Sequence, residues 1–187
     1  MKVQYSISLI LVWQVADAEA RHLKASNIEP MHLLLGLCKV VDIDLPEFVS
    51  KDSPDRDAVL EELLREVRKL RTVFRSAKVD AAILRRRLRG VAMKDRLSLA
   101  ESGRLRRSHA AREVFAEAEQ YSQLGGNTVY PVHLLYASLT NADADRDALF
   151  EELSIDKGLL IDIVKTEVIS RVGKSHSMKS NSRTRWN

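Results

Sequence analysis

The sequence has few of the residues that cross-link or interrupt a small protein. Its single cysteine, Cys38, excludes a disulfide framework and a zinc site built from cysteines. Seven glycines and four prolines in 187 residues are about half of average usage, which argues against collagen-like repeats and turn-rich sandwiches. Aromatic residues make up 5%, and the apolar fraction of 45% is that of an ordinary globular chain. This length suits one domain or two small ones.

The charge is unevenly distributed along the chain. The net charge is +4, but residues 1–64 carry −5, residues 65–112 carry +12 and residues 113–187 carry −3. The candidate contacts for a polyanion or an acidic partner are the clustered arginines Arg85, Arg86, Arg87, Arg89, Arg104, Arg106 and Arg107. Clustered cations favour nucleic acid through counterion release, yet this block offers only Phe74 for base stacking and has no recognised nucleic-acid motif. A solvated or protein-docking face is favoured, and nucleic-acid binding is the alternative.

Apolar residues recur at spacings of three and four, which predicts helices rather than strands. Eight helices are expected, over about residues 5–25, 30–41, 57–75, 80–89, 109–124, 131–140, 148–153 and 156–171. Pro30 opens a segment that is apolar nearly all round, which predicts a buried central helix. The apolar stretch 7–13 after Lys2 also fits a signal peptide, as the weaker interpretation, but it is too short for a membrane span.

The second half of the sequence repeats the first. The first matching set recurs at an offset of 101: Leu23, Ile28, Pro30, His32, Leu33 and Leu34 correspond to Leu124, Val129, Pro131, His133, Leu134 and Leu135. The second set recurs at an offset of 76: Phe74, Val79, Asp80 and Leu84 correspond to Phe150, Ile155, Asp156 and Leu160. The first copy therefore carries 25 additional residues. Two similar helical units would bury their apolar faces against each other, which predicts a pseudo-twofold helical domain.

The segment from Glu19 to Leu37 resembles the start of the Clp amino-terminal domain, the double-repeat module at the front of ClpA-, ClpB- and ClpC-type AAA+ unfoldases. The segment from Val129 to Leu139 resembles the same motif. The resemblance covers about residues 5–171 and implies an all-α bundle of about eight helices. We expect a first repeat over 1–90 with an insertion at about 42–71, a basic linker over 91–107, a second repeat over 108–172 and a disordered tail over 173–187.

The resemblance implies a module that receives substrate or adaptor proteins for unfolding and proteolysis. The sequence contains no phosphate-binding loop of the type G-x-x-x-x-G-K-[ST], so ATP hydrolysis is not expected of it. Free-standing relatives, such as accessory subunits of chloroplast Clp proteases, are also known in the family. Met31 and Val132 replace the glutamate that helps ClpC-type members bind phosphorylated arginine, and neither can pair with a guanidinium. Phosphoarginine recognition by that route is therefore doubtful.

No set of residues in the sequence predicts a catalytic or metal site. His32 and His133 occupy equivalent positions near two helix starts, where a structural hydrogen bond is favoured over a metal or general-base role. Cys38 lies on the apolar helix and is expected to act as a small hydrophobe. The aspartate-rich segment 42–57 lacks the spacing and central glycine of an EF-hand loop. No cofactor, metal or catalytic residue is predicted.

The sequence thus predicts a non-catalytic, cytoplasmic Clp N-domain-like protein that binds client or adaptor polypeptides, or a Clp ATPase or protease complex. Membrane association is not expected. The apolar groove between the repeats is the expected contact region. The residues expected to contribute to it are Glu29, Met31, Tyr130 and Val132. The alternative is a basic helical protein that binds nucleic acid through the Arg85–Arg107 region.

Overall fold

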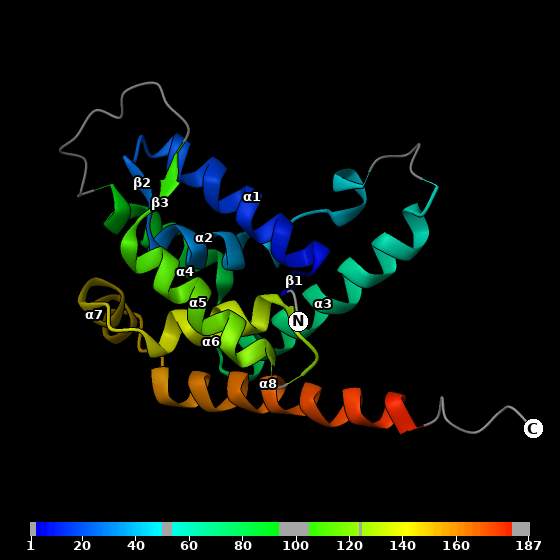
Figure 1. Ribbon diagram of the computed structural model, residues 1–187. Coiled ribbons are helices and arrows are strands. Elements are labelled where there is room, and N and C mark those ends of the chain that lie inside the picture. Colours follow the sequence, from blue (N-terminus) through cyan, green and yellow to red (C-terminus); the bar gives the residue numbers. More distant parts are fainter. Residues whose placement is uncertain (1–2, 50–53, 94–104, 124, 181–187) are drawn as a thin grey trace, which may run out of the picture.

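The computed structural model describes residues 3–49, 54–93, 105–123 and 125–180 (Figure 1). Within them the chain forms eight α-helices, one 3-10 helix (Leu45–Phe48) and four two-residue strands. The helices are α1 (Ile7–His22), α2 (Pro30–Val40), α3 (Arg56–Ser76), α4 (Ala81–Ala92), α5 (His109–Gln123), α6 (Pro131–Thr140), α7 (Ala144–Glu152) and α8 (Lys157–Ser180). The expected all-α fold with about eight helices is confirmed.

The same order of elements occurs twice along the chain. A strand, a helix, a second strand and three further helices form each repeat: β1 (Gln4–Tyr5) and β2 (Asn27–Ile28) flank α1, and β3 (Arg106–Arg107) and β4 (Thr128–Val129) flank α5. The first helix of each repeat begins after a serine. Ser6 Oγ accepts a hydrogen bond from the Leu9 amide at 3.2 Å, and Ser108 Oγ accepts one from the Ala111 amide at 3.1 Å. These side chains satisfy amides that a helix start leaves without a backbone partner.

The strands join the two repeats to each other. β1 of the first repeat pairs in parallel with β4 of the second, and β2 pairs in parallel with β3. In register, Tyr5 lies opposite Val129 and Ile28 lies opposite Arg107. The leading strand of each repeat therefore binds the trailing strand of the other. The sequence did not predict these strands, because two residues are too short to show an alternating pattern.

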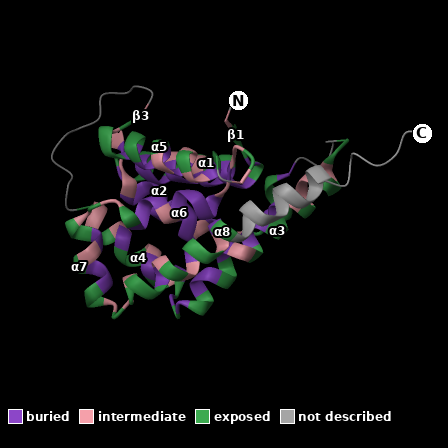
Figure 2. Cartoon of the chain, turned by 60° about the horizontal axis from the view of Figure 1, so that its bottom comes forward, coloured by how far each residue is buried: buried purple, intermediate pink, exposed green. Residues whose placement is uncertain are grey.

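The core is built around α2 and α6, one helix from each repeat. Both lie in the middle of the molecule and are buried over most of their surface (Figures 1 and 2). α2 packs against α1 and α4, whereas α6 packs against α5 and α8. The prediction that the segment opened by Pro30 forms a buried central helix is confirmed, and the equivalent segment opened by Pro131 is buried in the same way. The residues 7–13, for which a signal peptide was the second interpretation, form the start of α1 and contribute Leu9, Leu11 and Val12 to this core.

The additional residues of the first repeat lie in two places. α3 has 21 residues whereas its counterpart α7 has nine, and the connection before α3 covers residues 41–55 whereas the connection before α7 covers 141–143. The start of α3 projects from the body of the molecule (Figure 1), and the Asp57 side chain there is 98% exposed. The inserted length thus extends one edge of the fold and leaves the packing around α2 and α6 intact.

Some boundaries differ from those expected. α7 begins at Ala144, earlier than predicted, because the Asp143 side chain accepts a hydrogen bond from the Arg146 amide at 2.9 Å and caps the helix. α8 continues to Ser180, into the segment expected to be a disordered tail, and residues 181–187 lie outside the described part of the chain. Of the expected basic linker, residues 94–104 also lie outside it. No helix in the described residues is both long and apolar enough to cross a membrane.

The close crossing of α1 and α2 gives a stability prediction. A Cβ atom at Gly36 would lie 2.6 Å from the Val12 carbonyl oxygen and 3.3 Å from the Ala16 Cβ. We expect Gly36→Ala to lower the free energy of unfolding by about 2 kcal/mol, because the two helices must separate. Gly90→Ala is the matched control, since a Cβ there meets nothing within 4 Å. It should raise stability by about 0.5–1 kcal/mol through helix propensity. Urea unfolding measures both changes, and equal effects of the two substitutions would contradict the prediction.

Candidate binding groove

The four residues expected to contact a partner do not form one surface. Glu29 and Tyr130 precede α2 and α6, and both are half-buried. Met31 and Val132 are 9% and 1% exposed, so their side chains belong to the core. Glu29 and Met31 line a cavity of about 370 Å³ at the N-terminal end of α2, which Asp143 also lines. Tyr130 and Val132 are not among the residues of this cavity.

The two histidines support the turns that precede the central helices. His32 Nδ1 accepts a hydrogen bond from the Glu29 amide at 2.9 Å, and His133 Nδ1 accepts one from the Tyr130 amide at 3.1 Å. Both side chains are buried. Burial lowers the pKa of His32, although the Glu19 carboxylate acts in the opposite direction. The structural role expected of both histidines is confirmed. Among the described residues, no three histidine, cysteine or acidic side chains lie close enough to hold a metal ion.

Three arginines of α4 form ion pairs within the fold. Arg89 donates to the Glu19 carboxylate through two nitrogens, at 2.7 Å and 2.5 Å. Arg87 pairs with Glu152 of α7, and an Arg85 nitrogen lies 3.9 Å from a carboxylate oxygen of Asp42. These pairs tie α4 to α1, to α7 and to the segment after α2. Much of the basic run therefore compensates acidic residues of the same chain, which no local pattern in the sequence could show.

The remaining members of the arginine set are scattered. Arg86 is exposed on α4, and Arg106 and Arg107 are exposed on β3. Arg104 lies outside the described residues. Arg107 is the member whose guanidinium contacts aromatic rings, as described below. The described arginines thus divide between α4 and β3 instead of forming one run.

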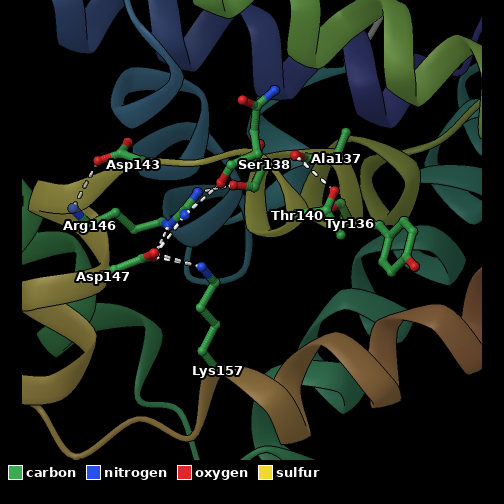
Figure 3. A network of polar contacts seen from close by, with 9 residues as sticks. Tyr136, Ala137, Ser138, Thr140, Asp143, Arg146, Asp147 and Lys157 are labelled. Carbon is green, nitrogen blue, oxygen red and sulfur yellow. Dashed lines mark hydrogen bonds and ion pairs between the residues drawn. The ribbon is translucent and has the colours of Figure 1, made fainter.

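A second polar network lies in the second repeat and is structural. The buried Arg146 of α7 donates to the carbonyl oxygens of Ser138 and Asn141, the latter at 2.7 Å, and to the Asp147 carboxylate (Figure 3). Lys157 of α8 donates to the same carboxylate at 2.7 Å and 2.8 Å. Burial raises the pKa of Asp147, but the hydrogen bonds and charges of Lys157 and Arg146 outweigh it and lower the pKa. The network satisfies carbonyls at the end of α6 and anchors α7 and α8 to it.

An apolar groove lies where the two repeats meet. Its lining residues come from β1, α1, β3 and α5: Tyr5, Leu9, Ile10, Trp13, Arg107 and Phe115. The groove has a volume of about 250 Å³. Tyr5 and Ile10 are 43% and 46% exposed, and the neighbouring Ile7 is 36% exposed. Contiguous exposed apolar residues of this size mark interaction sites more often than ordinary surface.

Aromatic rings form the floor of this groove. The Trp13 and Phe115 rings meet edge to face at a centroid distance of 5.7 Å, and Tyr5 meets Phe115 edge to face at 6.3 Å. The Arg107 guanidinium lies over both ring systems, 4.8 Å from the Phe115 centroid and 5.6 Å from the Trp13 centroid. Such contacts fix the side chains in place and favour a preformed site.

Two apolar residues of α1 could have indicated this groove from the sequence, but they were read only as part of an amphipathic helix. Ile7 and Ile10 lie outside the set of α1 residues that face the core, yet they are apolar and three positions apart. A helix of a globular protein normally carries polar residues there. These two exposed apolar residues on α1 are therefore the sequence feature that could have indicated the groove. The partners from β3 and α5 could not be assigned without the pairing of the strands.

The helices and strand pairs have the architecture of the N-terminal domains of Hsp104 and ClpD, so the chain has the Clp N-terminal domain fold. The sequence itself matches no protein family profile and no curated protein. Among solved structures, the Hsp104 N-terminal domain from Candida albicans is similar with a TM-score of 0.61 and 16% identity, covering 90% of this chain and 95% of that one.

Two further structures share this architecture. A protein from a study of a malarial protein secretion system has a TM-score of 0.61 and 18% identity, covering 88% of this chain and 95% of that chain. The N-terminal domain of the chaperone ClpD from Arabidopsis thaliana has a TM-score of 0.50 and 18% identity, covering 88% and 94% respectively. At these identities the likeness establishes the fold, and it confirms the resemblance derived from the repeated motifs.

The buried ion pair of Glu19 gives a prediction about pH. Burial raises the pKa of Glu19, but the hydrogen bonds and charge of Arg89, with the charges of Lys39 and Arg85, outweigh it and lower the pKa below 4.5. A carboxylate whose pKa is lower in the folded state than in the unfolded state stabilises the fold at any pH above its unfolded-state pKa. This contribution is lost as the pH falls through its folded-state pKa. We expect Arg89→Met to cost about 2 kcal/mol at neutral pH, and that cost should shrink below about pH 4.5, where Glu19 is protonated on unfolding.

Urea unfolding between pH 7 and pH 3 measures this dependence. Arg86→Met, on the exposed face of the same helix, is the control and should change stability by less than about 0.5 kcal/mol at every pH. Glu19→Gln should flatten the acid side of the stability profile. A cost of Arg89→Met that stays constant over this range would contradict the role given to the pair.

Proposed function

We propose that the chain is a non-catalytic, polypeptide-binding module of protein quality control. Its ligands are client or adaptor polypeptides, or a partner in a Clp ATPase or protease complex, and it acts in the cytoplasm. The observation that carries this proposal is the exposed apolar groove at the junction of the repeats. The neighbouring structures are N-terminal domains of Hsp104 and of a Clp-associated chaperone, and this supports protein ligands as the class of partner.

The chemistry of the lining favours binding over catalysis. Five of the six lining residues are apolar or aromatic, and water released from such a surface favours association with another apolar surface. The Tyr5 hydroxyl donates to the Glu119 carboxylate. Burial, this hydrogen bond and the Glu119 charge raise the pKa of Tyr5 to about 12. The phenol therefore stays protonated at neutral pH and cannot serve as a base there.

The groove is also held by rigid elements. Tyr5 belongs to β1, and the residues on either side of it are held by backbone hydrogen bonds. The Gln4 amide donates to the Asn127 carbonyl at 2.9 Å, and the Ser6 amide donates to the Val129 carbonyl at 3.0 Å. Ile10 and Trp13 belong to α1, which is buried along its other face. A preformed groove loses little conformational entropy when a ligand binds. The cavity beside Glu29 and Met31 is a second contact region in this proposal.

Nucleic-acid binding through the Arg85–Arg107 region remains the alternative. The ion pairs of Arg85, Arg87 and Arg89 reduce the charge that is available for phosphate contacts. This alternative expects DNA or RNA retardation that weakens with salt and is lost when Arg85, Arg86 and Arg87 are replaced by glutamate.

The groove proposal is tested by placing a charge on its apolar wall. Ile10→Asp should weaken the binding of a dye-labelled, permanently unfolded protein at least about tenfold, because a carboxylate would have to be desolvated on the apolar wall. Ile83→Asp is the matched control: Ile83 lies on α4 and, like Ile10, is 46% exposed. Fluorescence anisotropy measures both affinities, and circular dichroism verifies that both variants are folded.

Two results would overturn this proposal. The first is that the unchanged protein does not bind the unfolded client. The second is that Ile10→Asp and Ile83→Asp weaken binding equally, which would place the contact elsewhere.

A further inference from the structure

The two sides of the groove are chemically different although the repeats are equivalent. The strand residue that faces the aromatic floor is Tyr5 in β1 and Arg107 in β3. In the helices that follow these strands, Trp13 of α1 corresponds to Phe115 of α5, and Ile10 corresponds to Arg112. The pseudo-twofold relation therefore pairs the apolar or aromatic Tyr5 and Ile10 of the first repeat with the cationic Arg107 and Arg112 of the second.

The Arg107 charge is not compensated by an ion pair among the described residues. Three arginines of the basic block, Arg85, Arg87 and Arg89, face carboxylates of the same chain. The Arg107 guanidinium instead contacts the Trp13 and Phe115 rings, and its charge acts to lower the pKa of Tyr5. Glu119 of α5 accepts the hydrogen bond of the Tyr5 hydroxyl. A guanidinium stacked on aromatic faces keeps its N–H edge available for a planar anion.

The backbone of Arg107 is held in position. Arg107 pairs with Ile28 in the β2–β3 ladder, and the next residue, Ser108, donates its amide to the Ile28 carbonyl at 3.1 Å. Ser108 also caps α5, so the strand and the helix start are fixed together. Both ends of the Arg107 side chain are thus positioned, one by the strand pair and the other by the rings. A preorganised guanidinium gives specificity for a carboxylate, with less entropy lost on binding.

We propose that the groove selects polypeptide segments in which an apolar residue lies next to an aspartate or glutamate. The apolar side chain occupies the Tyr5, Ile10 and Trp13 side, and the neighbouring carboxylate accepts hydrogen bonds from Arg107. This proposal rests on the proposed function and names the ligand class of the same groove. The ligand and the groove are complementary in two ways. The Arg107 charge attracts the carboxylate, and the apolar residues of the groove contact the apolar side chain.

Three short peptides, acetylated and amidated so that their ends are uncharged, test the proposal. They share one apolar core and differ at the adjacent residue, which is Glu, Gln or Lys. Binding is followed by the fluorescence of Trp13 in a Trp186→Phe background, since these are the two tryptophans of the chain. We expect the Glu peptide to bind about tenfold more tightly than the Gln peptide, the Lys peptide to bind more weakly than both, and the preference to decrease with salt.

Arg107→Gln separates charge recognition from the apolar contact. It should remove the preference for Glu over Gln while changing the affinity for the Gln peptide by less than about threefold. Arg107→Lys should restore part of the preference. Arg106→Gln is the matched control, because Arg106 is the exposed neighbour on the same strand and is not a lining residue of the groove. It should keep the full preference.

The outcomes distinguish this inference from the proposed function. If the unchanged protein binds the Gln and Glu peptides equally, the proposed selectivity for acidic residues is wrong, whereas peptide binding by the apolar groove is supported. If no peptide binds, the proposed function fails as well. Binding that requires a free C-terminal carboxylate, or binding to anionic lipid vesicles in place of the peptides, would also overturn the inference, as would an undiminished preference in Arg107→Gln.

Discussion

The exchange of strands between the repeats is the constraint on which the arrangement of this fold depends. Each pair has two residues per strand, but it takes one strand from each repeat. β1 and β3 lead directly into α1 and α5, and β2 and β4 lead into α2 and α6. Because all four helix starts are joined to these pairs, the position of one repeat determines the position of the other. Two four-helix units are thereby combined around one core.

The groove follows from the same constraint. Trp13 and Phe115 are equivalent residues of the two repeats, and they contact each other where the repeats meet. Such a contact between equivalent residues is expected at a pseudo-twofold axis. Residues near the axis are neighbours of their own counterparts, so a difference between the repeats becomes a difference between two walls of one site. Tyr5 and Arg107 are such a pair, and the asymmetry of the groove is the divergence of a duplicated position.

The repeated motifs allowed the fold to be predicted from the sequence, because helix periodicity, Pro30 with Pro131 and His32 with His133 are local signals that occur twice. The strands and ion pairs have no such signal. Glu19 and Arg89 are separated by 70 residues, and neither position is distinguishable from a solvated charge until the helices are packed. The expected contact residues Met31 and Val132 have buried side chains, because the second residue of a buried helix faces the core. Glu29, at the helix start, lines a cavity together with Met31.

The arginines of the basic block have different roles in the folded chain from those that their clustering in the sequence indicates. A net charge of +12 over residues 65–112 would favour a polyanion if the arginines formed one free surface. In the fold, Arg87 and Arg89 of α4 form ion pairs with acidic residues, one from each repeat. These acidic residues come from the two acidic blocks of the sequence. Charge separated along the chain is thus partly neutralised in space. Arg107, stacked on aromatic rings beside an apolar wall, has a different environment from the paired arginines. For that reason its charge is better suited to select a ligand than to stabilise the fold.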